Sequence, residues 1–106
     1  MEEITVHELK RMKDQGEEFL LLDVREPFEY EISNIDGMLI PLDQLADRID
    51  ELAGHEDKEV VIMCRSGGRS ARACEILSRN GFRQVKNLKG GVNDWARQID
   101  PSLPVY

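Results

Sequence analysis

Cys64 lies in a short loop whose residue types could make its thiol a nucleophile. Residues 64–70 read Cys-Arg-Ser-Gly-Gly-Arg-Ser. An apolar run at 60–63 precedes the loop and predicts a buried strand. Residues 71–79 predict a helix, because the Asn-Gly pair after them is typical of a helix end. The sequence therefore places a thiol between the end of a strand and the start of a helix.

Free N–H groups and positive charge are expected around this thiol. The first N–H groups of a helix have no partner inside it, and glycines let neighbouring N–H groups point into one concave nest. The helix dipole and two arginines add positive charge, so the pKa of the thiol should lie below its ordinary value of ~8.5. We predict Cys64 as the catalytic residue. The amides of its loop are expected to turn toward the Cys64 sulfur, and solvent is expected to reach that sulfur. The residues predicted to bind an anionic substrate or sulfur are Arg65, Ser66, Gly67, Gly68 and Arg69.

This loop resembles the active-site loop of the rhodanese, or sulfurtransferase, family. In that family the cysteine takes a sulfane sulfur from a donor as a persulfide and passes it to a nucleophilic acceptor. The resemblance implies a thiosulfate sulfurtransferase-like enzyme without a cofactor, whose donor is thiosulfate or a persulfide. Other segments match the family in the same order over nearly the whole chain: Leu21-Leu22-Asp23-Val24-Arg25-Glu26-Pro27, Ile40-Pro41-Leu42 and Leu88-Lys89-Gly90-Gly91-Val92.

Two departures from the family pattern point to a subgroup. Asn34 and Asp36 stand where the family usually has histidine and proline. With the segment 29–32 and the ending 99–106, they resemble the rhodanese domains fused behind ubiquitin-activating-like adenylyltransferases, which pass sulfur to the C-terminus of a ubiquitin-like carrier. A chain of 106 residues has no room for an adenylylating domain. The alternative function is therefore a sulfur-relay or protein-interaction module that works with a separate adenylyltransferase or carrier protein, or a domain excised from a longer chain.

Other uses of the cysteines fit the sequence less well than sulfur transfer. The loops of cysteine phosphatases and arsenate reductases resemble this one but read Cys-x5-Arg. Here the spacing from Cys64 to Arg69 is Cys-x4-Arg, a tighter ring that suits one terminal sulfur better than a phosphoryl group. The two histidines lie far from the cysteines without ligand-like spacing, so no metal site is expected. Cys74, on the predicted helix, is expected to be a core or surface cysteine, with a resolving thiol as the minority interpretation.

Length and charge narrow the class of protein. One domain is expected from 106 residues, no apolar run approaches the ~20 residues that span a bilayer, and two cysteines make no disulfide framework. An acidic start without a secretory signal indicates the cytoplasm. The net charge is −7, yet residues 64–89 carry +6 and residues 1–63 carry −12. This distribution favours a small anionic sulfur donor, or a protein donor, and disfavours nucleic acid and membrane.

The remaining pattern predicts an α/β fold, with strands and helices alternating along residues 1–99 and an extended tail at 100–106. Thr5 and Glu8 form a capping-box pattern before the first helix. This alternation predicts a single rhodanese-like domain with a parallel sheet of about five strands and helices on both faces. Arg25, after the second strand, is predicted to pair with Glu26 or Glu29. Helices are expected at 6–14, 27–30, 41–52, 71–79 and 92–99, and strands at 19–23, 38–40, 60–63 and 85–87, with a short one at Ile4.

Overall fold

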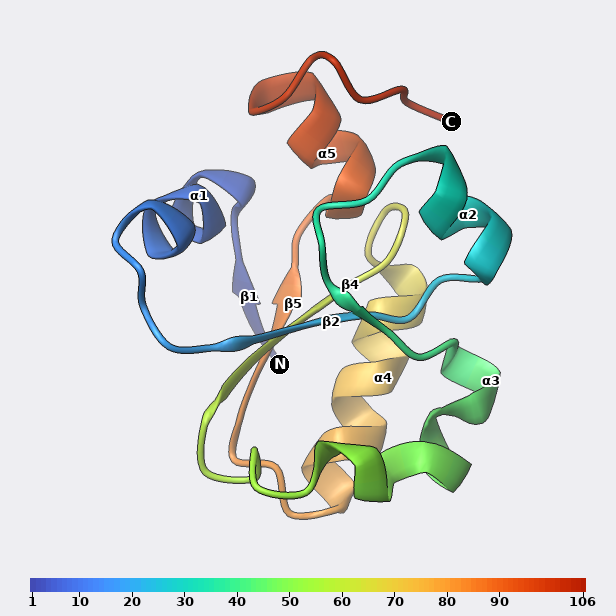
Figure 1. The fold of residues 1–106 in the computed structure, drawn as a ribbon. Helices are drawn as coiled ribbons and strands as arrows, with labels where there is room; N and C mark the ends of the chain where they lie inside the picture. Colours follow the sequence, from blue (N-terminus) through green and yellow to red (C-terminus); the bar gives the residue numbers. More distant parts are fainter.

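A five-stranded parallel sheet organises the protein in the computed structural model, which describes residues 1–106 (Figure 1). The strands lie in the order β1-β5-β4-β2-β3, so β4 is central. The elements in chain order are β1 (Glu2–Ile4), α1 (Val6–Asp14), β2 (Leu20–Asp23), α2 (Pro27–Ile32), β3 (Met38–Leu39), α3 (Leu42–Leu45), the 3₁₀ helix η1 (Ala46–Leu52), β4 (Glu59–Met63), α4 (Gly68–Arg79), β5 (Gln84–Leu88) and α5 (Gly91–Gln98).

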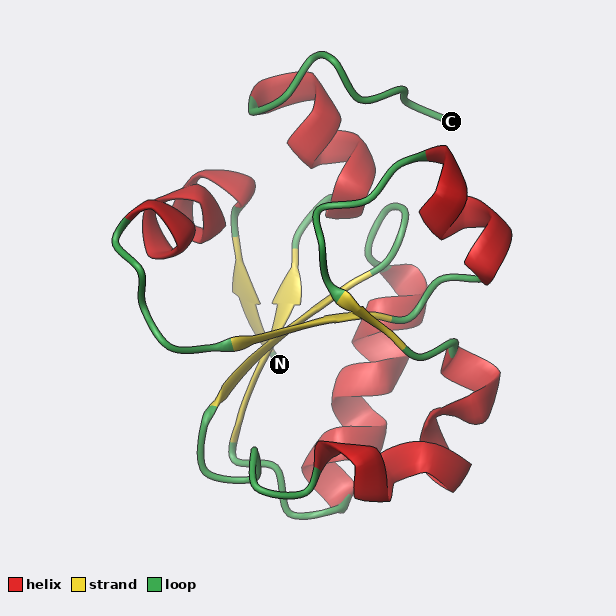
Figure 2. Ribbon diagram, viewed as in Figure 1, coloured by secondary structure: helices red, strands yellow, loops and turns green.

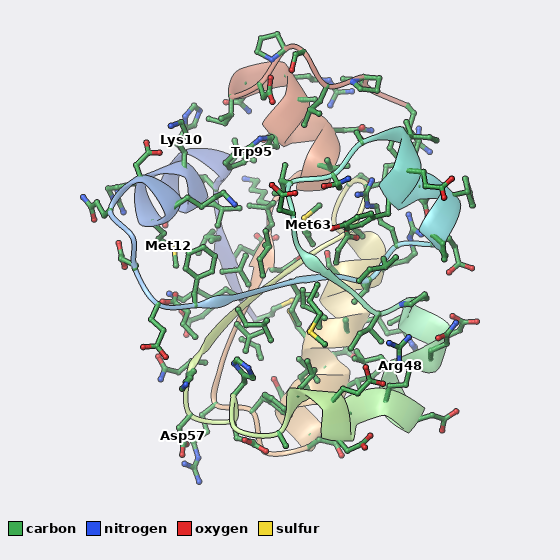
Figure 3. All side chains as sticks on the ribbon, in the orientation of Figure 1. Lys10, Met12, Arg48, Asp57, Met63 and Trp95 are labelled. Carbon is green, nitrogen blue, oxygen red and sulfur yellow. The ribbon has the colours of Figure 1, made fainter.

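Helices cover both faces of the sheet, as the alternation predicts (Figure 2). Successive residues of a strand point to opposite faces. Val60 and Ile62 of β4 therefore join one apolar core, packed under α3, η1 and α4, and Val61 and Met63 join the other, packed under α1 and α5. Figure 3 shows Met63 on the side of α1 and α5. Cys64 continues the alternation and belongs to the core beside α4.

Local sequence signals account for most of the helix boundaries. The capping box at Thr5 and Glu8 is confirmed, since the Thr5 hydroxyl accepts the Glu8 N–H at 3.1 Å and the Glu8 carboxylate accepts the Thr5 N–H. The helix predicted at 71–79 is longer, because Gly67 serves as its N-cap and α4 starts at Gly68. The end at Asn80 is as predicted.

The single helix predicted at 41–52 is wrong. The chain forms the short α3 and then η1, with a non-helical residue at Arg48 (φ −115°, ψ 15°). The apolar residues of the second half, Ile49 and Leu52, are three residues apart. A 3₁₀ helix brings such residues onto one side, which packs them against the core.

The carboxyl ends of β2, β4 and β5 meet at one edge of the sheet, and the loop that follows β4 lies there (Figure 1). In open parallel sheets this edge is where ligands bind. The tail after α5 also runs over this edge and ends near α2. None of the helices has the length and apolar character needed to cross a bilayer.

Candidate active site

The loop after β4 curls around the sulfur of Cys64. Gly67 has φ 116°, a left-handed conformation that favours glycine, and this turn points its N–H inward. The Gly67 N–H donates to Cys64 Sγ at an N···S distance of 3.1 Å. The predicted inward turn of the loop amides is present at this position.

The electrostatics of the loop favour the thiolate. Burial by itself would raise the pKa of Cys64, but hydrogen bonds from the Ser70 hydroxyl and from the N–H groups of Ser70, Gly67 and Ser66 outweigh it. The pKa of Cys64 is therefore lowered from its ordinary value. The Ser70 Oγ lies 3.4 Å from the sulfur. Ser70 was not among the residues predicted from the sequence to act on Cys64.

The accessibility of the sulfur differs from the expectation. Cys64 is only 1% exposed, because it continues the inward alternation of β4 and packs among the apolar residues beside α4. The largest surface pocket, about 590 Å³, includes Arg69 and Arg72 but not Cys64. Cys64 therefore lies below the surface and does not line this pocket.

The two arginines of the loop have different surroundings. Arg69 donates both Nη groups to the carboxylate of Glu29, at 2.5 and 2.8 Å. This pairing with Arg69 is the main reason that the pKa of Glu29 falls to about 2. Arg65 has no carboxylate within ion-pair distance and lies 5.0 Å from the centre of the Tyr106 ring, in cation–π geometry. Arg65 is therefore the loop cation left free to meet an anion.

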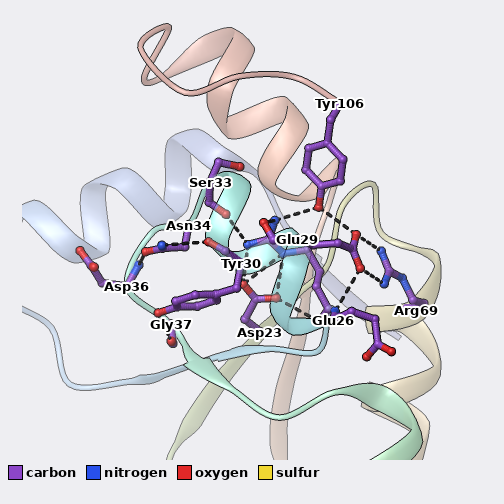
Figure 4. A network of polar contacts seen from close by, with 11 residues as sticks. Asp23, Glu26, Glu29, Tyr30, Ser33, Asn34, Asp36, Gly37, Arg69 and Tyr106 are labelled. Carbon is purple, nitrogen blue, oxygen red and sulfur yellow. Dashed lines mark hydrogen bonds and ion pairs between the residues drawn. The ribbon is translucent and has the colours of Figure 1, made fainter.

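A buried network behind the loop holds Glu29 in place (Figure 4). Arg25 is fully buried and pairs with Asp23 at 2.8 Å, so the predicted pairing with Glu26 or Glu29 is wrong. The carboxylate of Glu29 is instead occupied by Arg69, forty residues away along the chain. The Tyr106 hydroxyl accepts from Arg25 at 2.9 Å and donates to Glu29 at 2.8 Å. The tail residue thus connects both ion pairs.

The start of α5 anchors the backbone of the loop. The N–H groups of Val92 and Asn93 donate to the carbonyls of Cys64 and Arg65, at 3.0 and 3.2 Å. Gly91 packs so closely here that a Cβ atom would lie 2.4 Å from the Cys64 carbonyl oxygen. The Gly-Gly pair at 90–91 therefore fixes where the loop begins.

The other cysteine and the histidines lie outside this arrangement. Cys74 is buried on α4, and burial raises the pKa of its thiol to about 11, which disfavours a resolving role. His7 shares a hydrogen bond with Gln98, at a distance of 2.6 Å. No cluster of three histidine, cysteine or carboxylate side chains is arranged to hold a metal ion. Neither histidine is among the hydrogen-bond partners of Cys64 Sγ or the causes of its lowered pKa.

The sequence of this chain is similar to the sequences of several known proteins. A family model described as "Rhodanese-like domain" matches residues 5–98. The Zea mays protein named "Adenylyltransferase and sulfurtransferase MOCS3-1" is 38% identical over 97% of this chain, which spans only 23% of that protein. A protein of Allochromatium vinosum named "Sulfurtransferase" is 38% identical and matches 97% of this chain and 92% of its own length.

A solved structure gives the same result for the fold. The crystal structure of a rhodanese-related protein from Thermoplasma volcanium is 31% identical and has a TM-score of 0.80, over 100% of this chain and 98% of that chain. Since the family model covers most of the sequence and a relative of similar length is well above 30% identical, this chain belongs to the rhodanese-like domain family.

Proposed function

We propose that this protein is a sulfurtransferase that carries a sulfane sulfur on Cys64. The observation that supports the proposal most directly is the Gly67 N–H that donates to the Cys64 sulfur at 3.1 Å. The amides of this loop can stabilise the negative charge of a persulfide, whose outer sulfur is anionic. Arg65, which has no carboxylate partner, would neutralise an anionic donor such as thiosulfate or a persulfide.

The reaction divides into two balanced steps. The Cys64 thiolate attacks the outer sulfur of thiosulfate, a new S–S bond forms, and the S–S bond of the donor breaks, so that sulfite leaves with the electron pair. A nucleophile such as cyanide or a thiolate then attacks the outer sulfur of the Cys64 persulfide. The second S–S bond breaks and returns its electron pair to Cys64 as thiolate.

Mass spectrometry of the intact chain after thiosulfate treatment tests this proposal. We expect added mass of one sulfur atom, lost again on addition of cyanide. Cys64→Ser should show no addition, whereas Cys74→Ala, which removes a buried thiol of raised pKa, should keep it. An adduct that persists in Cys64→Ser would contradict the assignment.

A second role, as a module in a protein sulfur relay, is favoured by the likeness to a relative named as both adenylyltransferase and sulfurtransferase. In this role a ubiquitin-like carrier with an adenylated C-terminus would take the sulfur from Cys64. The outer sulfur of the persulfide would attack the adenylated carboxyl group and AMP would leave, which joins the carrier to Cys64 through an acyl disulfide. Incubation of the persulfide form with the adenylated carrier should yield this adduct, and a thiol added as the reductant should cleave its S–S bond and release a carrier thiocarboxylate, detected by its mass. A free thiol of this kind needs a reducing compartment, so we place the protein in the cytoplasm.

The phosphatase alternative is disfavoured by the occupied Arg69. A Cys-x5-Arg enzyme uses its arginine on the phosphoryl oxygens, whereas Arg69 is held by two hydrogen bonds to Glu29. An aryl phosphate should therefore not be hydrolysed. Turnover comparable to that of sulfur transfer would reverse the assignment.

A further inference from the structure

Three polar atoms lie around the hydroxyl of Ser70, at the first turn of α4. The Ser70 Oγ is 3.4 Å from Cys64 Sγ, 3.1 Å from the Gly67 carbonyl oxygen and 2.5 Å from Asn87 Oδ1. Asn87 comes from β5, near the end of that strand, and all three side chains are buried. A hydroxyl has one hydrogen to donate, so it can serve only one of these neighbours at a time.

The orientation of the Asn87 amide decides where that hydrogen goes. Asn87 Nδ2 donates to the Gly67 carbonyl at 3.1 Å, and the Ala71 N–H donates to the same oxygen at 3.1 Å. The reverse orientation of the amide would set its oxygen against the Gly67 oxygen, with no hydrogen between two acceptors. Asn87 therefore turns its oxygen to Ser70, and the Ser70 hydrogen lies between them.

This arrangement presents a lone pair of Ser70 to the sulfur. A protonated Cys64 can donate its S–H to that lone pair, but a thiolate cannot. The Ser70 O–H stabilises a thiolate only after it rotates away from Asn87. Because the site is buried, a Ser70 O–H without an acceptor would cost free energy. When the sulfur is uncharged and does not accept this hydrogen, the Asn87 oxygen accepts it.

We propose that Asn87 is a positioning residue that holds the Ser70 hydroxyl hydrogen when the Cys64 sulfur is uncharged and competes for it when the sulfur is a thiolate. The inference rests on the proposed function for its role in the cycle. Sγ is a thiolate before it attacks the donor and an uncharged sulfur in the persulfide. The Ser70 hydroxyl rotates between Cys64 and Asn87 at each half-reaction, and no proton is transferred.

A double-mutant cycle that measures the pKa of Cys64 tests the competition. The pKa is read from the ultraviolet absorbance of the thiolate in a Cys74→Ala background, with the Cys64→Ser chain as the blank. Asn87→Leu removes the competing oxygen, so we expect a lower pKa and a thiolate fraction roughly three- to tenfold larger below the pKa. Asn87→Ala removes the same oxygen and places no larger apolar side chain there. It should shift the pKa of Cys64 in the same direction.

Ser70→Ala provides the control for each Asn87 variant. Both Asn87 variants also lose the hydrogen bond to the Gly67 carbonyl, and that loss persists in the Ser70→Ala background. We expect Ser70→Ala to raise the pKa of Cys64. In the Ser70→Ala background, Asn87→Leu should change the thiolate fraction of Cys64 by less than about twofold. Arg65 and Arg69, the charged groups of the loop, are the same in every variant.

Two results would overturn the inference. One is an equal shift from Asn87→Leu with and without Ser70, which would mean that Asn87 acts through the loop backbone. The other is a rise in the pKa in both Asn87 variants. Because titration needs no sulfur donor, a chain that shows the expected cycle but takes no sulfur from thiosulfate would contradict the proposed function alone.

Discussion

Arg65 and Arg69 look equivalent in the sequence, yet only one of them has a free charge in the structure. Both follow the cysteine closely, and spacing cannot say which carboxylate each one meets. Arg69 pairs with Glu29, whereas Arg65 lies over the Tyr106 ring. Arg69 should therefore act mainly on stability, and Arg65 mainly on binding of an anion.

Replacement of each arginine by methionine, which keeps the length and removes the charge, separates these roles. Arg65→Met should raise KM for thiosulfate about tenfold, the loss expected of one charge-assisted contact, with little change in the free energy of unfolding. Arg69→Met should lower that free energy by about 1–2 kcal/mol, because Glu29 loses its partner. The loss is limited because the Arg69 side chain is 37% exposed, so solvent screens part of its charge. Steady-state kinetics and urea unfolding of both variants measure the two effects, and the opposite pattern would contradict the distinction.

The surroundings of the Cys64 loop could be predicted from the sequence only for residues close to Cys64 in the chain. The loop at 65–69 was recognisable from spacing and glycine content. Glu29, Tyr106 and Asn87 come from distant parts of the chain, and only the fold brings them to the loop. Asn87 alone had a signal, since it ends the strand predicted at 85–87 and the carboxyl ends of parallel strands meet at one edge of a sheet.

Among the elements, α5 packs tightly against the loop. Its first residue, Gly91, has φ 58°, and a Cβ atom there would lie 2.4 Å and 2.5 Å from the carbonyl oxygens of Cys64 and Arg65. These oxygens accept hydrogen bonds from the next N–H groups of α5. Neither the loop nor α5 can therefore move away without losing these hydrogen bonds. The contact sets the position of the loop relative to the sheet.

Gly91→Ala should therefore be strongly destabilising. We expect a loss of about 3 kcal/mol or more in the free energy of unfolding, from overpacking and from a strained φ. Gly68→Ala is the matched control for stability, since nothing lies within 4 Å of its Cβ position and its φ is not positive. It should leave stability unchanged or raise it, because alanine favours the helix more than glycine does. Urea unfolding of the two variants makes the comparison, and equal losses would contradict it.

Hydrophobic periodicity predicted most elements within one or two residues and missed the helix geometry in one place. Strong runs such as 60–63 are unambiguous, because both of their faces are buried. The segment 46–52 has apolar residues at spacings that suit an α-helix and a 3₁₀ helix alike. Packing against the core, which the sequence does not display, decides between them.

At the scale of the whole molecule, the carboxyl edge of the sheet is held together by one carboxylate. Glu29 lies on α2, accepts from Arg69 of α4 and accepts from Tyr106 of the tail (Figure 4). The sequence predicted the parallel sheet but not this junction, in which the partners of Glu29 lie 40 and 77 residues away along the chain. The stability of the molecule in acid should therefore depend on this side chain.

Glu29→Gln tests that dependence, because glutamine has nearly the same shape and no charge. In the folded protein the pKa of Glu29 is about 2, against the ordinary 4.5 expected of the unfolded chain. A carboxyl whose folded pKa is lowered contributes stability above its unfolded pKa and loses it as the pH falls toward its folded pKa. The wild-type protein should thus exceed Glu29→Gln by on the order of 3 kcal/mol near neutral pH.

This excess should shrink as the pH falls from about 4.5 toward 2. Urea unfolding of both proteins at a series of pH values measures it. Glu31→Gln, an exposed glutamate on the same helix without an ion-pair partner, is the matched control and should match the wild-type protein throughout. A difference between wild type and Glu29→Gln that stays constant across this range would show that the ionised carboxylate is not what joins α2, α4 and the tail. The junction would then depend on shape alone, and the lowered pKa of Glu29 would have no part in holding the loop arginine in place.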